Sequence, residues 1–429
     1  MKHLLLAAGL FLAPLQDDAQ IKELIRKLDD SDFQTRDEAF HALVKAGPKA
    51  VALLKEAAEK STSAEVKTRA ADAIKAIDLA VKAASVYREP ARINAAFADT
   101  PLPRALEDVA KQAGVRLEGL AHAPEAPLTL KLENATLLEA LDRICAAQEQ
   151  LTYAHASEGV VSLVKEKHAQ PPAVYFGPFR VQIGELTITR KSDFKATTTT
   201  ASFTLASEHE KHLKPLAKVR FEISKAIDDQ GTELQVARVG DAEAAALGGG
   251  GAVVIMGLGG MRPPDSDRRF EAKGFSPAAT GFRLLQGTAT FLFPLQYTDV
   301  KFKAPAANDR EETGDFAFKV LQTRQRYIEF EVTRTKGTEA VGQDEIDRRL
   351  DADSVVLVDA DGKEHKAESL QPSGLDSIVI GPGGVERKLK YRAMFATAGV
   401  RNAKELRFRF IDKTLEKQAP FEFKDVRVP

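Results

Sequence analysis

The feature that most limits what this chain can fold into lies between residues 101 and 153, where one helix-then-strand pattern occurs twice. The copies are offset by 35 positions, since Leu102 aligns with Leu137. In each copy, apolar residues recur at i, i+3, i+4, i+7 and i+8, the spacing that lines one face of a helix. They are Leu102, Ala105, Leu106, Val109 and Ala110 in the first copy, and Leu137, Ala140, Leu141, Ile144 and Cys145 in the second. The repeat predicts two helices packed on one core, with Cys145 as a small buried residue rather than a nucleophile.

Segments of alternating polarity surround these helices and predict strands, because a period of two is typical of a half-buried strand. Thr136 with Glu139 predicts a capping box at the second helix, and Thr100 with Pro101 predicts a cap and first-turn proline at the first. The predicted strands are residues 93–97, 115–120, 128–134, 151–155 and 160–166. Together they predict a small module with the order β-α-β-β-α-β-β over residues 90–168.

This order and the phrase LTLKLENATLLEALDRIC at residues 128–145 resemble the short N-terminal domain of secretins and TonB-dependent receptors. In that family the domain is a periplasmic protein-contact module, so the resemblance implies protein contact in the cell envelope. Nothing after residue 170 resembles a secretin ring domain or a plug and membrane barrel. Pore or receptor function is therefore not expected.

The N-terminus has a basic start at Lys2, an apolar run from Leu4 to Leu15, and then Asp17 and Asp18. This run is shorter than the about 20 apolar residues that span a bilayer, and it predicts a secretory signal peptide over residues 1–19. The sequence does not define the cleavage position, and a buried or disordered helix is the alternative. We expect an exported protein, periplasmic or extracellular, with no transmembrane segment in the mature chain.

Residues 20–88 predict a helical segment with an internal echo, because DFQTR at 32–36 recurs as EVKTR at 65–69. Ser31 with Gln34 predicts a capping box, followed by a helix with Phe33 on its apolar face. The spacing of Asp32, Arg36, Ala39, Leu43 and Gly47 resembles a HEAT repeat, and short versions are common at the start of exported planctomycete proteins. In HEAT proteins the arginine helps to pack one unit on the next, so the resemblance implies structural roles for Arg36 and Arg69.

The remainder of the chain has the period of two of strands, separated by Gly, Asp and Pro turns. This pattern predicts two antiparallel β-sandwich domains, at residues 173–303 and 304–429. AIDDQG at 226–231 and LVDADG at 357–362 place similar turns 131 positions apart, since Asp228 aligns with Asp359. That echo suggests that the two domains are related.

A glycine-rich insert at residues 240–267 interrupts the first of these domains. It carries an apolar tip made of Val253, Val254, Ile255, Met256 and Leu258. We expect an extended hairpin whose tip packs on a neighbouring domain, since exposed apolar runs are rare on soluble proteins. The alternative is a contact for a partner or a membrane surface.

No motif in the sequence predicts a reaction, a cofactor or a metal site. Lys and Arg number 61 against 62 Asp and Glu, which gives no global footprint for nucleic acid. One cysteine excludes an internal disulfide.

HEKH at 209–212 lacks the zinc-protease spacing and predicts a surface loop. Asp359, Asp361 and Glu364 predict a hairpin turn rather than a calcium loop. GPGG at 381–384 predicts a turn, and the alternation over residues 407–410 predicts a strand with phenylalanines on one face and arginines on the other.

The sequence therefore predicts a multidomain α+β protein: a HEAT-like helical segment, a small α+β module and two β-sandwich domains. The predicted role is non-enzymatic protein contact or scaffolding in the cell envelope, with protein partners and no nucleic acid. A cell-surface carbohydrate- or ligand-binding protein is the alternative, and an unrecognised hydrolase comes third.

Overall fold

The computed structural model describes the parts of the chain that carry most of these predictions. The described residues are 17–148, 150–157, 159–168, 171–192, 194–195, 197–216, 219–239, 269–335, 343–350, 352–373, 377–381, 384–396 and 399–427. Residues 1–16, most of the predicted signal peptide, lie outside them. So does the glycine-rich insert, with Val253, Val254, Ile255, Met256 and Leu258.

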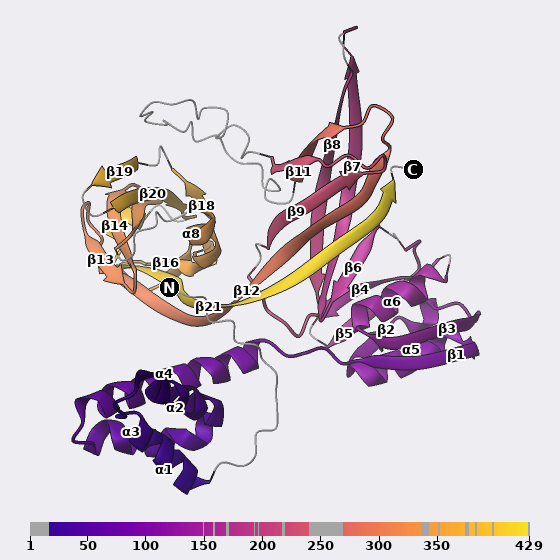
Figure 1. The fold of residues 1–429 in the computed structure, drawn as a ribbon. Coiled ribbons are helices and arrows are strands. Elements are labelled where there is room, and N and C mark those ends of the chain that lie inside the picture. The colour runs from indigo at the N-terminus through magenta and orange to yellow at the C-terminus, as the bar shows by residue number, and fades with distance from the viewer. Residues whose placement is uncertain are drawn as a thin grey trace. The chain divides into compact units, whose positions relative to one another are not determined.

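The protein has a mixed α+β fold, and this coarse prediction is confirmed. The chain divides into two compact units, Met1–Arg88 and Glu89–Pro429. The first is helical, and the second holds several antiparallel sheets (Figure 1).

The first unit is a small helical bundle built from α1 (Asp18–Lys27), α2 (Phe33–Ala46), η1 (Gly47–Ala50), α3 (Val51–Lys60) and α4 (Ala64–Val86). Asp32 caps α2 by accepting from the Thr35 N–H at 2.8 Å, so the predicted capping box at Ser31 is wrong. Phe33 is also not a core residue, because 64% of it is exposed. The core is formed by Ile21, Leu28, Ala39, Leu43, Ala50, Leu54, Val66, Ala70, Ala73 and Ile77.

The two arginines of the predicted echo make contacts inside this unit. Arg36 donates to the carbonyls of Asp30 at 2.6 Å and Ser31 at 3.1 Å. Arg69 donates to the Glu65 carboxylate at 2.5 Å. Both sets of contacts lie within this unit, and the role of the two arginines in packing HEAT-like units stays a prediction.

The second unit begins with the predicted α+β module, whose element order is confirmed. The elements are β1 (Ile93–Pro101), α5 (Leu102–Ala113), β2 (Arg116–Glu118), η2 (Leu120–His122), β3 (Pro127–Ala135), α6 (Leu137–Ala146), β4 (Thr152–Ser157) and β5 (Val160–Val164). All ten apolar residues of the doubled stripe are buried. Strand β1 pairs with β3, and β5 pairs with both β4 and β2, in parallel with the latter.

The starts of the two module helices differ. Thr136 caps α6 as predicted, accepting from the Glu139 N–H at 3.4 Å. The predicted cap at Thr100 is wrong, because Pro101 occupies the cap position of α5 and makes no side-chain cap bond. The Leu102 N–H instead donates to the carbonyl of Ala126 at 3.2 Å.

Two β regions follow the module. The first contains β6 (Ala173–Phe176), β7 (Phe179–Ser192), β8 (Thr197–His209), β9 (Arg220–Asp228), β10 (Gln235–Arg238), β11 (Arg269–Phe275) and β12 (Gly281–Lys303). The second contains β13 (Arg310–Thr313), β14 (Phe316–Thr323), β15 (Tyr327–Arg334), α8 (Gln343–Arg349), η4 (Ala352–Ser354), β16 (Val355–Val358), β17 (Glu364–Lys366), β18 (Ser369–Pro372), β19 (Ser377–Gly381), β20 (Gly384–Met394), η5 (Gly399–Asn402) and β21 (Glu405–Arg427).

The two β regions repeat one topology. Their main sheets have the orders β10-β11-β8-β7-β6 and β18-β20-β15-β14-β13, so the first three strands of each region occupy matching places. Each sheet starts with the same hairpin, in which a glycine at positive φ takes the first loop position. These glycines are Gly177 at φ 54° and Gly314 at φ 56°. The shared order supports the predicted relation between the regions.

The two aspartate turns also match in detail. Asp228 accepts from the N–H groups of Gln230 at 3.0 Å and Thr232 at 2.7 Å. Asp359 accepts from the corresponding N–H groups of Asp361 at 3.0 Å and Lys363 at 2.9 Å. The predicted hairpin turn at Asp359 is confirmed, since β16 and β17 pair directly across it.

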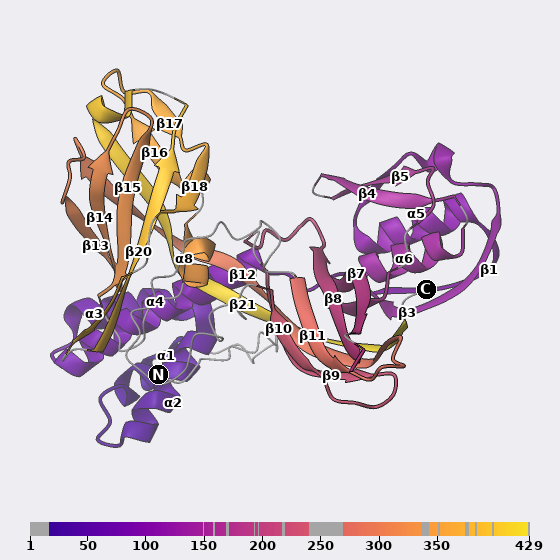
Figure 2. The ribbon, with the colours of Figure 1, turned by 90° about the horizontal axis from the view of Figure 1, so that it is seen from above.

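Strands β12 and β21 join the two regions. They pair antiparallel from Gly281 opposite Arg427 to Lys303 opposite Glu405 (Figure 2). Strand β9 pairs with the first half of β12, and β16 pairs with the first residues of β21, so the central sheet has the order β17-β16-β21-β12-β9. The predicted domain boundary at 303/304 stays a prediction. The last part of β21, which follows this boundary in sequence, lies in the same sheet as β9, which precedes it.

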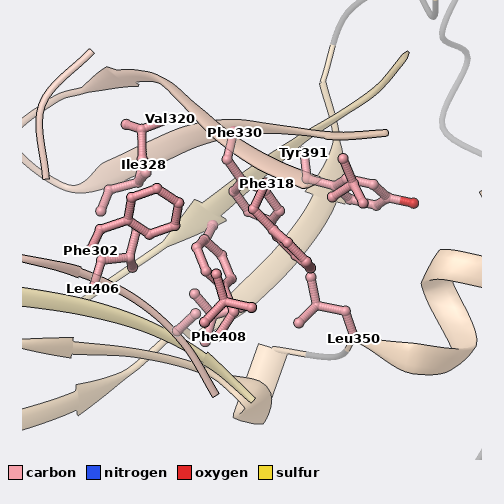
Figure 3. Packing of buried hydrophobic residues seen from close by; sticks show 14 of the residues in the cluster. Phe302, Phe318, Val320, Ile328, Phe330, Leu350, Tyr391, Leu406 and Phe408 are labelled. Atoms are coloured by element: carbon pink, nitrogen blue, oxygen red, sulfur yellow. The ribbon is translucent and has the colours of Figure 1, made fainter. Parts of the chain in front are cut away.

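Phenylalanines from this strand pair enter both cores. Phe408 of β21 lies 4.5 Å from Phe330 and 5.3 Å from Phe318, measured between ring centroids, in the core of the second region (Figure 3). Phe291 of β12 stacks on Phe179 at 3.9 Å in the first region. The predicted alternation over residues 407–410 is confirmed, because Phe408 and Phe410 are fully buried.

Replacing Phe421 with alanine tests the strand pair. Phe421 is 3% exposed on the last part of β21, and its ring approaches Gly287 of β12 so closely that a Cβ there would lie 2.5 Å away. Phe421→Ala should cost about 3–5 kcal/mol of the free energy of unfolding. In hydrogen exchange the loss of protection should centre on β9 and the first half of β12. Lys424→Ala on the same strand is the control, and equal losses in both variants would contradict the pairing.

Candidate functional site around Asp142

Helix α6 carries a carboxylate into the interior of the second unit. Asp142 is only 9% exposed although it lies among the apolar residues of the helix. Burying an unpaired carboxylate is very unfavourable, so its surroundings must supply hydrogen bonds and positive charge. These come from the module itself and from the strands of the first β region.

The Asp142 carboxylate is fully engaged. Tyr153 of β4 donates to Oδ1 at 2.7 Å, and Tyr175 of β6 donates to Oδ2 at 2.5 Å. The Arg180 guanidinium of β7 donates to both oxygens at 2.7 Å. His168 Nε2 lies 3.1 Å from Oδ1. One side chain therefore connects the module to two strands of the neighbouring sheet.

A second acidic residue completes the group around Arg180. The guanidinium also donates to the Glu208 carboxylate of β8, so it lies between two acids. Burial, together with the nearby Asp142 charge, raises the pKa of Tyr153 and Tyr175, which keeps both phenols protonated as donors. Both phenols therefore donate to Asp142, and these hydrogen bonds together with those of Arg180 hold the group in one geometry.

Glu210 makes a second polar contact at the start of the same helix. It is 5% exposed, and its carboxylate accepts from the Leu137 N–H at 3.3 Å. His212 Nδ1 lies 3.4 Å from its other oxygen. Burial raises the pKa of Glu210 to about 7, while the Leu137 N–H and the charge of Arg92 oppose that rise. Glu210 thus contacts the first turn of α6, and Arg180 contacts Asp142 near the middle of the same helix.

This arrangement suits a structural contact better than a reaction. The side chain of Asp142 is 12% exposed, that of His168 9% and that of Arg180 15%, so little of the group can meet a substrate. Its donors already bond to its acceptors. We therefore treat these residues, here called the Asp142 junction (Asp142, Tyr153, His168, Tyr175, Arg180 and Glu208), as a docking site between modules.

The residues that the sequence singled out are not brought together here. Cys145 is fully buried, as predicted, and burial raises the pKa of its thiol to about 12. The prediction of a surface loop at HEKH is wrong for Glu210, because α6 covers it. Among the described residues, no group of three or more His, Cys, Asp and Glu side chains could hold a metal ion.

Comparison with known proteins finds no match: no family model fits the chain, and no curated protein or solved structure matches it. None of the helices in the described ranges combines the length and the apolar character needed to cross a membrane.

Sequence reasoning missed the Asp142 junction and Glu210. The one available signal was a carboxylate inside an apolar helix. In the doubled segment, Asp142 aligns with Glu107 under the offset of 35, and Glu107 is exposed. Asp142 is covered by Tyr175 and Arg180 of the neighbouring sheet, whereas Glu107 lies at the surface.

Arg180→Met should strongly destabilise the second unit. The change leaves Asp142 and Glu208 without their shared cation, which should cost about 3–5 kcal/mol in urea unfolding. The double variant Asp142→Asn/Arg180→Met should cost less than the sum of the two single changes. Arg310→Met is the control, because its ion pair with Glu312 is exposed and should contribute less than about 1 kcal/mol. A cost for Arg180→Met as small as the control's would refute the junction.

Glu210→Gln should change how stability depends on pH. The folded state raises the pKa of Glu210 from 4.5 to about 7, so it favours the protonated acid, and the stability that this residue contributes is lost as the pH rises through that window. The variant should be more stable than the wild type above pH 7, by at most about 3 kcal/mol, and equal to it in acid. Glu185→Gln, an exposed site on β7, is the control. A constant difference across the pH range would contradict the assignment.

Proposed function

We propose that the protein is a non-enzymatic, exported scaffold of the cell envelope that binds other proteins by surface contact. The observation that carries the proposal is the Asp142 junction, which fixes the α+β module of residues 90–168 against a β-sheet. Buried ionic groups of this kind are a poor source of stability but can specify one orientation between packed elements. A fixed orientation is what a scaffold needs in order to present two surfaces together.

The proposed domain layout follows the sequence. Residues 20–88 are a HEAT-like segment, residues 90–168 are a module like the short N-terminal domain of secretins and TonB-dependent receptors, and residues 173–303 and 304–429 are two β-sandwich domains. The element order of the module and the repeated topology of the β regions support it. The proposed location is the periplasm or the cell exterior, on the basis of the apolar N-terminal run.

A carbohydrate-binding role is the second candidate, and one observation bears on it. Tyr297 is 45% exposed on β12, and the Arg409 guanidinium lies 4.7 Å from its ring centroid. Sugar rings stack on exposed aromatic faces, although Arg409 already covers one face of the Tyr297 ring. The other large aromatic side chains that are exposed in the described parts of this unit, Phe176 and Phe194, come from different strands or loops, so we place protein contact first.

Site-specific photo-cross-linking in the native envelope tests the proposal. Probes at Thr129 and Glu133, exposed on β3 of the module, and at Arg310 on β13 should each give adducts with defined envelope proteins. In the Arg180→Met variant, adducts that need the module and the sheet together should decrease, while those made by one surface alone should persist. No protein adduct at any position, with a soluble oligosaccharide protecting Tyr297 from modification, would favour the second candidate instead.

A further inference from the structure

The hairpin of β7 and β8 extends beyond the rest of its sheet. The two strands remain paired from Phe179 opposite His209 to Ser192 opposite Thr197. Their neighbour β11 pairs with β8 only between Thr199 and Thr204. Figure 1 shows the end of the hairpin projecting past the other strands. The tip is thus a two-stranded element that stands clear of the core.

Phe194 lies at this tip in a doubly unfavourable position. It is fully exposed, and its φ of 67° lies in the left-handed region that bulky side chains avoid. Its N–H donates to Ser192 Oγ at 3.3 Å, which holds the backbone turn. An exposed phenyl ring and a strained backbone at one residue both cost free energy, and such strain concentrates at functional sites.

The residues that flank Phe194 in sequence are charged or small and polar, and bases outnumber acids. Lys191 and Lys195 are exposed on either side of it. In sequence, residues 191–195 read KSDFK and carry a net charge of +1, from two basic residues and one acid. The preceding Arg190 is turned to the body of the region, because its guanidinium donates to the Ala279 carbonyl at 2.8 Å. The stem below is rich in exposed threonine, at positions 187, 189, 197 and 198. The apolar side chain of Phe194 therefore lies at the end of the hairpin. The basic residues Lys191 and Lys195 come next, and neutral threonines of the two strands follow.

We propose that this tip docks on the surface of an anionic lipid bilayer. Phe194 enters the boundary between headgroups and acyl chains, and Lys191 and Lys195 lie at the level of the phosphates. Interfacial binding of this kind adds buried apolar area to attraction between cations and anionic lipids. It does not depend on the protein contacts proposed above.

The size of the tip favours a lipid surface over a protein pocket. A specific protein interface buries about 800 Å² on each partner, and an aromatic anchor contributes most when a ring of further contacts excludes water around it. A projecting two-stranded tip with one apolar side chain has no such surrounding surface. A bilayer needs none, because the headgroup layer closes around the inserted ring.

A single tryptophan at the tip provides a local test, because the chain contains no tryptophan. With vesicles of phosphatidylglycerol and phosphatidylcholine, the emission of full-length Phe194→Trp should move to shorter wavelength. Pure phosphatidylcholine should leave it unchanged. Phe176→Trp is the matched control, because Phe176 is 44% exposed in the hairpin at the other end of β7. Its emission should not move, and circular dichroism shows whether both variants fold.

Charge reversal separates the parts of the proposal. Adding Lys191→Glu and Lys195→Glu to Phe194→Trp should raise the lipid concentration at half-maximal shift about tenfold or more, and high salt should act in the same direction. No shift for Phe194→Trp, or equal shifts for both tryptophan variants, would overturn the proposal. An equal response to neutral vesicles would overturn the anionic assignment. A shift produced only by an envelope protein would replace lipid with a protein pocket.

Discussion

The pairing of β12 with β21 is the constraint on which the rest of the second unit depends. Each strand begins in one β region and ends in the other, so each region is completed by backbone that also belongs to its neighbour. Phe291 and Phe302 lie on the same strand but enter different cores. Because apolar burial dominates the stability of such cores, packing in one region fixes the strand on which the other is built. The sheet whose strands β6, β7 and β8 supply Tyr175, Arg180 and Glu208 also packs on this strand pair, because Phe179 of β7 stacks on Phe291 of β12.

Local periodicity was sufficient to predict the module, because its signals lie within single elements. The ten stripe residues, the cap at Thr136 and the order of seven elements all follow from spacing along the chain. The Asp142 junction could not be found in the same way. Arg180 and Glu208 are distant in sequence from α6, and Glu107 shows that a carboxylate at the equivalent helix position remains exposed when no sheet covers it.

The β regions show the same division between local and distant information. The turns at Asp228 and Asp359 were visible in the sequence, because an aspartate side chain bonds to the N–H groups just after it. The sequence did not show which strand pairs with which. Alternation of polarity states which residues share a face, but it does not state which strand lies alongside, so the pairing of residues 281–303 with 405–427 was missed.

The ribbon formed by β12 and β21 also sets the order in which the protein can mature. Gly281 pairs with Arg427, 146 positions later, so this edge of β12 in the first β region stays unpaired until β21 has been synthesised. Contacts of such long range form slowly, and unpaired strand edges stay open until they do. Before β21 is present, a nascent chain therefore exposes a long unpaired edge of β12, which is a site for aggregation or for binding by a chaperone.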